Sequence, residues 1–319
     1  MELKILVMLP CLNEAENLPR VIASLPKTLG DHAIDQLVVD DGSTDGSAEV
    51  ARENGAIVIS HGTNFGVGRA FQTGLAFAIK QRYDIMVTID ADGQFPVSDI
   101  PRLVGPILDR TASFVSANRF ANNEQIEHMP AIKRWGNARM TTLISRLAGK
   151  KFYDVSCGFR AYSRDAMLRL NLMGQFTYTQ EVFLNLAFKG MPIQEVPITV
   201  EYFPHRKSRV AGSITRYALN TSKIIFRTYR DYFPLKFFAG IGLGLMVPGL
   251  LLLMFLFSWY LYSGAFTPHI WSGFVGGGFL LAAAFCFILG LLADMMVRLR
   301  HNQEEILYLL RQDQRDGRS

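Results

Sequence analysis

Short apolar segments alternate with longer amphipathic segments through the first 120 residues of the chain. A strand that is apolar almost throughout is buried on both faces of a sheet, and intervening helices cover those faces. The pattern therefore predicts an α/β, Rossmann-like head with a mostly parallel sheet. The predicted strands occupy residues 4–10, 35–41, 56–62, 84–92 and 113–120, and the predicted helices occupy residues 16–29, 43–55, 66–82 and 97–110.

Polar clusters follow four of the predicted strands. They read "PCLNEAEN" after the first strand, "DDGSTDGS" after the second, "DADGQ" after the fourth and "ANRF" after the fifth. Ligands of open α/β sheets bind at the carboxyl ends of the strands. We therefore expect one site to collect all four clusters.

Two apolar segments close the chain, at residues 237–262 and 270–296. Residues 237–296 contain one acidic residue and no Lys or Arg, and each segment is long enough to cross a bilayer as a helix. A buried helical pair in a soluble core is the alternative, but these segments have no polar face. Basic residues on both flanks predict a two-helix transmembrane hairpin in the inner (plasma) membrane, with both chain ends and the head in the cytoplasm.

Residues 213–236 interleave aromatic and aliphatic residues with Arg and Lys near helical spacing. Such a basic amphipathic stretch is typical of a helix that lies in the membrane interface. An ordinary surface helix of the head is the alternative.

Charge and cysteine content narrow the class of protein further. The net charge is +5, and the basic excess flanks the apolar tail, which favours anionic lipid headgroups over nucleic acid as a partner. Cys11, Cys157 and Cys286 lie far apart without a CxxC pair, so neither a disulfide framework nor a zinc site is indicated. The first apolar run is too short for a signal peptide.

The residues themselves suggest a cation site. Asp90 and Asp92 are separated by one Ala, so on a strand their side chains would share a face and could converge on Mg²⁺ or Mn²⁺. Asp40 and Asp41 end a neighbouring predicted strand, where a carboxylate can accept hydrogen bonds from a ribose or a base. An ordinary acidic turn is the alternative there.

Four motifs in this order, "LPCLNEAENL", "VVDDGSTDGS", "NFGVGRA" and "DADGQFP", resemble inverting family 2 glycosyltransferases of the GT-A fold. "DVSCGFRAYSRDAM" and the two-helix tail are similar to polyprenyl-phosphate glycosyltransferases related to dolichol-phosphate mannose synthase. The resemblance implies transfer of one hexose from a nucleotide-diphosphate sugar, of UDP-glucose or GDP-mannose type, to undecaprenyl or dolichyl phosphate. It also implies Mg²⁺ or Mn²⁺ as cofactor, and a homo-oligomer.

The resemblance assigns roles on the donor side. A divalent cation would bridge the leaving diphosphate to the acidic turn, which makes Asp92 catalytic. Leu12 stands where relatives often carry an aromatic residue, so base stacking is not expected there. Gln94 would contact the metal or the diphosphate, and the alternative is that it only caps the loop before Pro96. Donor binding falls to Pro10, Glu14, Asp40, Asp41, Asp90 and Gln94, and metal binding to Asp90, Asp92 and Gln94.

On the acceptor side, the resemblance places Arg119 and Arg134 at the lipid phosphate. Arg206 belongs to a basic loop that we expect to close over both phosphates, although a solvated charge run is the alternative. Asp154 is expected to orient the acceptor, because a phosphate oxygen is already ionised and needs no strong base. Asp92, Asp154 and Arg119 are thus the predicted catalytic residues.

The sequence divides into a GT-A catalytic domain at 1–212, a juxtamembrane segment at 213–236, the transmembrane helices within 237–297 and a cytoplasmic tail at 298–319. Two other functions are alternatives to this transferase. A processive polysaccharide synthase needs a channel of several helices and a QxxRW-like motif, which the sequence lacks. A membrane scaffold that binds nucleotide sugars without turnover stays open.

Overall fold

The computed structural model describes residues 2–120, 131–172, 178–200, 222–223, 226–227 and 229–316. The chain divides into two compact units. The head unit comprises Met1–Ile225 together with Leu307–Ser319, and the helical unit comprises Phe226–Ile306.

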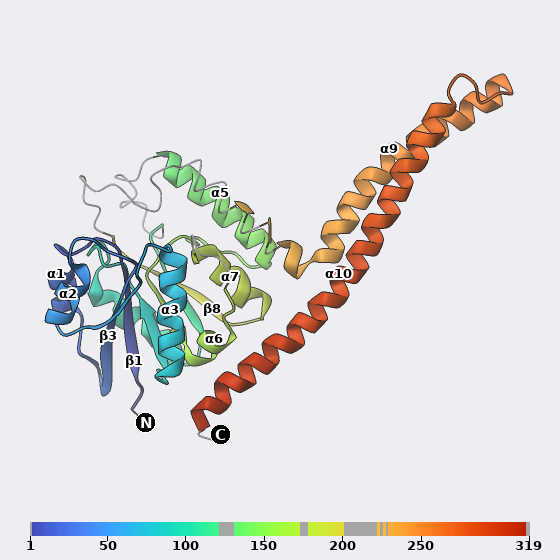
Figure 1. Ribbon diagram of the computed structural model, residues 1–319. Helices are drawn as coiled ribbons and strands as arrows, with labels where there is room; N and C mark the ends of the chain where they lie inside the picture. Colours follow the sequence, from blue (N-terminus) through green and yellow to red (C-terminus); the bar gives the residue numbers. More distant parts are fainter. Residues whose placement is uncertain are drawn as a thin grey trace. The chain divides into compact units, whose positions relative to one another are not determined.

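The head unit is built on a mixed eight-stranded sheet with the order β2-β3-β1-β5-β7-β6-β8, in which β4 pairs with β3 (Figure 1). The β1/β3, β1/β5, β3/β4 and β6/β8 pairs are parallel, whereas β7 runs antiparallel to both β5 and β6. The strands are β1 Ile5–Cys11, β2 Thr28–Leu29, β3 His32–Asp40, β4 Ile57–Ser60, β5 Ile85–Thr88, β6 Phe114–Asn118, β7 Arg160–Ser163 and β8 Ile193–Pro197.

Helices cover both faces of this sheet because alternate residues of each strand point to opposite sides. Ile5, Val7 and Leu9 of β1 belong to a core cluster with residues of α1, α2 and α4, while Leu6 and Met8 belong to a second cluster with α3, α6 and α7. The helices are α1 Leu18–Ser24, α2 Ser47–Glu53, α3 Val67–Lys80, α4 Ile100–Leu108, α5 Ala131–Ala148, α6 Arg164–Arg169 and α7 Thr179–Phe188, with a 3₁₀ turn at Val97–Asp99.

The predicted Rossmann-like α/β head is confirmed, and the five predicted strands correspond to β1, β3, β4, β5 and β6. The sheet is less parallel than the sequence suggested. The difference comes from β7, which inserts antiparallel between β5 and β6 and begins with the charged residue Arg160.

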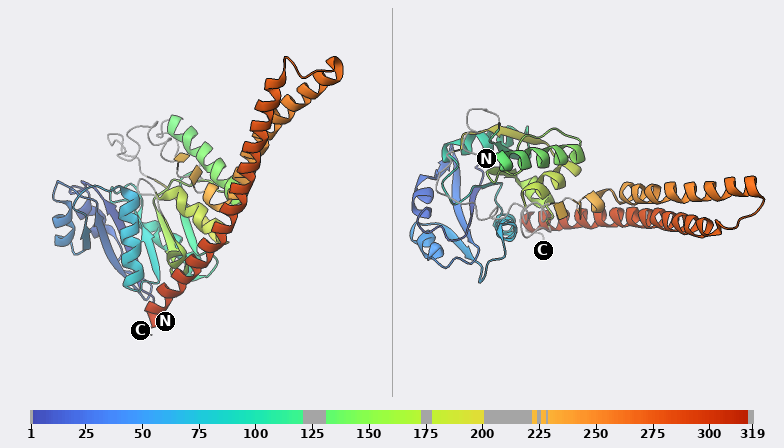
Figure 2. Two further views of the ribbon diagram at one scale, coloured as in Figure 1. Left: turned by 45° about the vertical axis from the view of Figure 1, so that its right-hand side comes forward. Right: turned by 90° about the horizontal axis from the view of Figure 1, so that it is seen from above.

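The helical unit contains α9 (Pro234–Ser263) and most of α10 (Ile270–Asp316), which lie side by side in every view (Figure 2). Both helices are long and apolar enough to cross a membrane. Small residues allow close packing: a Cβ on Gly249 would lie 3.0 Å from the Gly276 carbonyl oxygen, and a Cβ on Gly276 would lie 3.0 Å from that of Gly249. Glycines at such contacts are common where membrane helices pack.

Helix α10 continues about twenty residues beyond the predicted end at residue 296, and its last part belongs to the head unit. There, Arg311 Nη1 donates to the carbonyl oxygens of Leu168, at 2.8 Å, and Leu170, at 3.2 Å. The Arg169 guanidinium lies over the Tyr308 ring at 4.2 Å. Residues 307–313 therefore pack against the rest of the head unit, and the four-part division of the chain stays a prediction.

Candidate active site

The carboxyl ends of three adjacent parallel strands bring the acidic clusters together. Strand β1 lies between β3 and β5, and its residues Pro10 and Cys11 pair in register with Val39 and Asp40 of β3. Because all three strands run in the same direction, the loops that follow them lie at one edge of the sheet. Pro10, Asp40 and the acidic turn after β5 thus share this edge, as the sequence predicted.

The acidic turn comprises residues 90–94. Since β5 ends at Thr88, Asp90 and Asp92 lie in a turn, so the expectation of a shared strand face was wrong. Gly93 adopts φ +72°, which favours glycine, and Asp92 Oδ1 accepts a hydrogen bond from the Gln94 backbone N–H at 3.0 Å. Both carboxylates are half-buried.

Asp41 is a structural anchor for the loop after β4. Its Oδ1 lies 2.8 Å from His61 Nδ1 and accepts from the Phe65 backbone N–H at 3.1 Å, while Oδ2 accepts from the Gly66 N–H at 2.7 Å. His61 Nε2 in turn lies 2.9 Å from Thr73 Oγ1. Sequence reasoning missed His61, because no local pattern signals a partner twenty residues away.

Asp40 and Glu14 are also buried and engaged within the protein. Asp40 Oδ1 accepts from the Ser43 backbone N–H at 3.0 Å. Glu14 Oε2 accepts from Asn17 Nδ2 at 2.8 Å, and its backbone N–H donates to Ser47 Oγ at 2.8 Å. These contacts fix both carboxylates at the strand ends.

A buried ion pair joins β6 to the loop before β7. Arg119, directly after β6, donates to Asp154 through two nitrogens, from Nε to Oδ2 at 2.6 Å and from Nη2 to Oδ1 at 2.9 Å. Nη2 also donates to Ser156 Oγ at 2.7 Å, and that hydroxyl donates to Asn137 Oδ1 at 2.5 Å. The Asp154 side chain is fully buried, whereas that of Arg119 is 17% exposed. The structure thus pairs two residues that the sequence assigned to the acceptor side separately.

The charge state of this pair follows from its contacts. Burial alone would raise the pKa of Asp154, but the charge and hydrogen bonds of Arg119 outweigh burial and hold this pKa below its ordinary value. Asp154 is therefore a carboxylate at neutral pH. A bidentate carboxylate fixes the plane of the guanidinium.

The family model described as glycosyl transferase family 2 matches residues 6–170, about half of the chain. An uncharacterised protein of Methanocaldococcus jannaschii is 31% identical over 227 residues, which are 70% of this chain and 90% of that protein. The chain belongs to glycosyl transferase family 2.

Two relatives of this glycosyltransferase have names that state their substrates. The UDP-N-acetylglucosamine-dolichyl-phosphate N-acetylglucosaminyltransferase of Methanococcus voltae is 31% identical, over 64% of this chain and 88% of its own. The undecaprenyl-phosphate mannosyltransferase of Micrococcus luteus is 27% identical, over 66% of this chain and 89% of its own. The predicted resemblance to polyprenyl-phosphate glycosyltransferases is thereby confirmed.

Solved structures agree with the fold of the head. Glucosyl-3-phosphoglycerate synthase from Mycobacterium tuberculosis, in complex with Mn²⁺, UDP-glucose and phosphoglyceric acid, superposes with a TM-score of 0.56 at 22% identity. The match covers 71% of this chain and 80% of that one. The predicted GT-A Rossmann-like architecture is therefore confirmed.

The acidic turn of this glycosyltransferase suits a divalent cation. The described part of the chain holds no group of three or more His, Cys, Asp or Glu side chains that could enclose a metal. Mg²⁺ needs no such cage, since it is usually bound by one or two carboxylates together with substrate phosphates and water. Asp90 and Asp92 supply two half-buried carboxylates in one turn, which fits that requirement.

Glu195 of β8 supports the loop that carries Asp154. Its carboxylate accepts from the backbone N–H groups of Tyr153, at 2.9 Å, and Asp154, at 2.7 Å. Burial raises the pKa of Glu195, although these two hydrogen bonds act against it. Sequence reasoning missed this residue, because its contact spans about forty residues and β8 itself was not predicted.

The other two predicted acceptor residues are less constrained by the structure. Arg134 is exposed on α5, on the segment that follows β6 in the chain. Arg206 and its basic loop lie outside the described residues. Their roles stay predictions.

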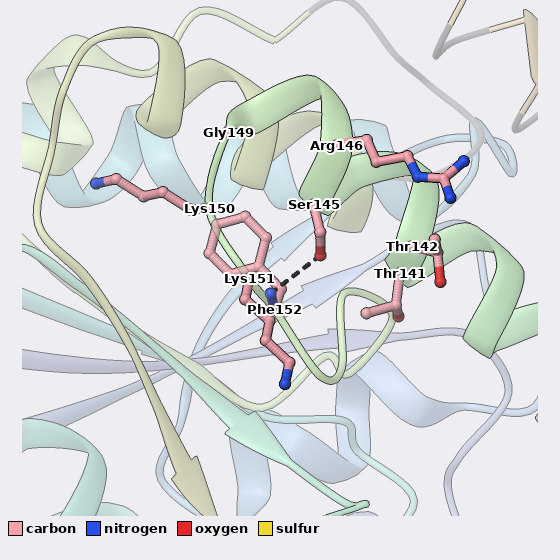
Figure 3. Close-up of a pocket in the computed structure, with 8 residues that line it drawn as sticks. All are labelled: Thr141, Thr142, Ser145, Arg146, Gly149, Lys150, Lys151 and Phe152. Atoms are coloured by element: carbon pink, nitrogen blue, oxygen red, sulfur yellow. Dashed lines mark hydrogen bonds between the residues drawn. The ribbon is translucent and has the colours of Figure 1, made fainter.

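A surface pocket of about 420 Å³ lies at the C-terminal end of α5. Ser145 Oγ accepts from the Phe152 N–H at 3.0 Å inside it. The Arg146, Lys150 and Lys151 side chains point away from one another (Figure 3), so they do not form a joint anion site. The pocket contains none of the predicted site residues. It is lined by Thr141, Thr142, Ser145, Arg146, Gly149, Lys150, Lys151 and Phe152.

Proposed function

We propose that this glycosyltransferase moves one hexose from a nucleotide-diphosphate sugar, of UDP-glucose or GDP-mannose type, to a polyprenyl phosphate at the cytoplasmic face of the inner membrane. One observation supports the proposal most directly: the chain combines a family 2 head with two helices long enough to cross a membrane. The head contains both an acidic turn and a buried Arg–Asp pair. The names of the relatives support the acceptor class.

On the donor side, Asp90 and Asp92, with Gln94, would hold Mg²⁺ or Mn²⁺ against the diphosphate. A bound divalent cation supplies charge neutralisation for a departing diphosphate. Asp40, Asp41 and Pro10, at the ends of β1 and β3, would lie beside the bound nucleotide. Since Asp41 already takes three hydrogen bonds from within the protein, we assign its role to shaping the loop rather than to a sole ribose contact.

On the acceptor side, Arg119 would bind the lipid phosphate. One phosphate oxygen attacks the anomeric carbon as the bond to the diphosphate breaks, and attack from the opposite face inverts the configuration. That oxygen is ionised at neutral pH, so no residue has to remove a proton. Asp154 contributes by holding the guanidinium in one orientation, and Arg134 and Arg206 add positive charge. The two apolar helices would keep the head at the membrane that contains the lipid.

The test is transfer itself. Full-length protein in detergent is incubated with undecaprenyl phosphate, Mn²⁺ or Mg²⁺ and radiolabelled UDP-glucose, UDP-N-acetylglucosamine or GDP-mannose in parallel. Label in the lipid phase with one donor supports the proposal and identifies that donor. Binding of a donor without label in lipid would instead favour the non-catalytic scaffold, and products of increasing length would favour a processive synthase. Sedimentation of the same sample tests the homo-oligomer.

A further inference from the structure

A five-residue loop, 154–158, touches both halves of the site. Asp154 at its start pairs with Arg119. Gly158 at its end lies against the acidic turn: a Cβ there would come within 2.8 Å of Asp90 Oδ1. The Gly158 carbonyl also accepts from Thr88 Oγ1, at the end of β5, at 2.7 Å. A shift of this loop would therefore move the acceptor-side pair and disturb the donor-side carboxylate together.

Arg160, the first residue of β7, lies directly under this loop and is fully buried. Its Nε donates to the Cys157 carbonyl at 2.7 Å and its Nη2 to the Val155 carbonyl at 3.1 Å. Nη1 donates to the Thr179 carbonyl at 2.9 Å, so the same side chain ties the loop to α7. A planar guanidinium donates from three nitrogens in fixed directions and can therefore hold three separated carbonyls, whereas the three donors of a Lys ammonium share one nitrogen.

The surroundings of Arg160 are unusual for a buried cation. Its other neighbours include the rings of Phe183, at 5.0 Å from the guanidinium carbon, Phe114, at 5.6 Å, and Tyr178, at 5.7 Å. Removing a charge from water costs several kcal/mol, and here the three carbonyls and the faces of these rings offset that cost. The carbonyls that Arg160 holds belong to loop residues between Asp154 and Gly158. Positioning of this loop therefore explains why a charged side chain is buried here, whereas packing alone does not.

Glu195 complements Arg160 at the start of the loop. It accepts from the N–H groups of Tyr153 and Asp154, whereas Arg160 donates to the carbonyls of Val155 and Cys157. The backbone is thus held by an anion at its donors and by a cation at its acceptors.

We propose that Arg160 is a positioning residue, which holds loop 154–158 so that the Arg119–Asp154 pair and Asp90 keep their places relative to each other. The inference rests on the proposed function for what the two sides bind. Loss of the hydrogen bonds from Arg160 to the three carbonyls is expected to weaken metal-nucleotide binding at the acidic turn and to raise the KM for the lipid acceptor. If Arg160 had a purely structural role, its substitution would lower the melting temperature and leave metal binding and the acceptor KM unchanged.

The test compares Arg160→Lys with Arg164→Lys in the full-length protein. Arg164 is a second buried Arg, and it donates to the Tyr83 carbonyl at 3.0 Å, so it controls for loss of a buried guanidinium. Mn²⁺ binding in the presence of UDP or GDP is measured by electron paramagnetic resonance, beside the melting temperature and transfer kinetics. We expect at least a tenfold loss of Mn²⁺ affinity and a raised acceptor KM for Arg160→Lys, and neither for Arg164→Lys. Unchanged Mn²⁺ affinity and acceptor KM in Arg160→Lys would overturn the inference.

Gly158→Ala keeps the test decisive if Arg160→Lys does not fold. The backbone of Gly158 is not in the left-handed region, so the added methyl displaces the Asp90 carboxylate rather than straining the chain. We expect weaker Mn²⁺ binding with a nearly unchanged melting temperature, and wild-type Mn²⁺ affinity would contradict the coupling. The two proposals can fail separately. If the wild-type protein binds Mn²⁺ with nucleotide but transfers no label to lipid, the proposed function is refuted. The role of Arg160 is then still tested by the Mn²⁺ affinities of the variants.

Discussion

Replacing Asp154 by Asn tests the buried ion pair directly. The substitution keeps the shape of the side chain but removes its charge and replaces one acceptor oxygen with an N–H donor. Arg119 donates to both carboxylate oxygens, so one of its two hydrogen bonds to this side chain is lost. The guanidinium loses the countercharge of Asp154 in a site where its own side chain is 17% exposed.

The size of the effect follows from burial. Removing one partner of a buried pair costs about 3–5 kcal/mol, and the partial exposure of Arg119 favours the lower end of that range. A domain of this size loses roughly 2–4 °C of melting temperature per kcal/mol. Asp154→Asn is therefore expected to lower the melting temperature by about 6–12 °C. Glu49→Gln is the matched control, because the Glu49–Arg52 pair is exposed and such pairs contribute about 0–1 kcal/mol.

The pH dependence provides a second readout. The folded protein holds the pKa of Asp154 below its ordinary value of 3.8, so the unfolded chain binds a proton first as the pH falls. The stabilising effect of the carboxylate is complete above that value and is lost as the pH drops through the folded pKa. The difference in melting temperature between wild type and Asp154→Asn should thus be constant near neutral pH and shrink as the pH falls below about 3.8. A variant as stable as wild type at pH 7, or a difference that does not depend on pH, would refute the reasoning.

Three further predictions concern other parts of the chain. Asp92→Asn is expected to abolish transfer, because it removes a carboxylate that would hold the divalent cation, while the melting temperature changes little, because Asn keeps the oxygen that accepts from the Gln94 N–H; most activity remaining at saturating Mn²⁺ would contradict this role. Gly42→Ala is expected to lower the melting temperature markedly, since Gly42 has φ +80° and a Cβ there would lie 2.6 Å from the Thr63 carbonyl carbon. In sealed vesicles, Ser319→Cys should react with an impermeant reagent on the side of the head and Phe266→Cys on the other, whereas labelling of both from one side would rule out the hairpin.

The part of the fold that could be predicted is the part with a clear apolar pattern. Strands β1 and β5 are apolar almost throughout, and β3 is apolar at Leu37–Val39, because helices cover both of their faces, and this pattern is visible in the sequence. Strand β7 has four residues and begins with Arg160, and β8 is only half-buried, so neither carries that signal. Their places in the sheet depend on tertiary pairing.

The same distinction applies to the site. The acidic turn and Arg119 were found because their residue types and motifs are local. The pairing of Arg119 with Asp154 spans 35 residues, and the support from Glu195 spans 41 more, so both depend on how β6, β7 and β8 meet. No spacing rule predicts that a buried Arg160 lies beneath the loop.

The Arg119–Asp154 pair also explains how an acidic donor side and a basic acceptor side can share one site. An unpaired guanidinium near Asp90 and Asp92 would be drawn towards their carboxylates and would oppose a divalent cation there. Because Asp154 holds Arg119 through two parallel hydrogen bonds, the guanidinium has a fixed direction, and the pair carries no net charge. Under the proposed function, Arg134 and Arg206 supply the positive charge that the neutral pair does not, and Arg119 contributes directed hydrogen bonds to the acceptor phosphate.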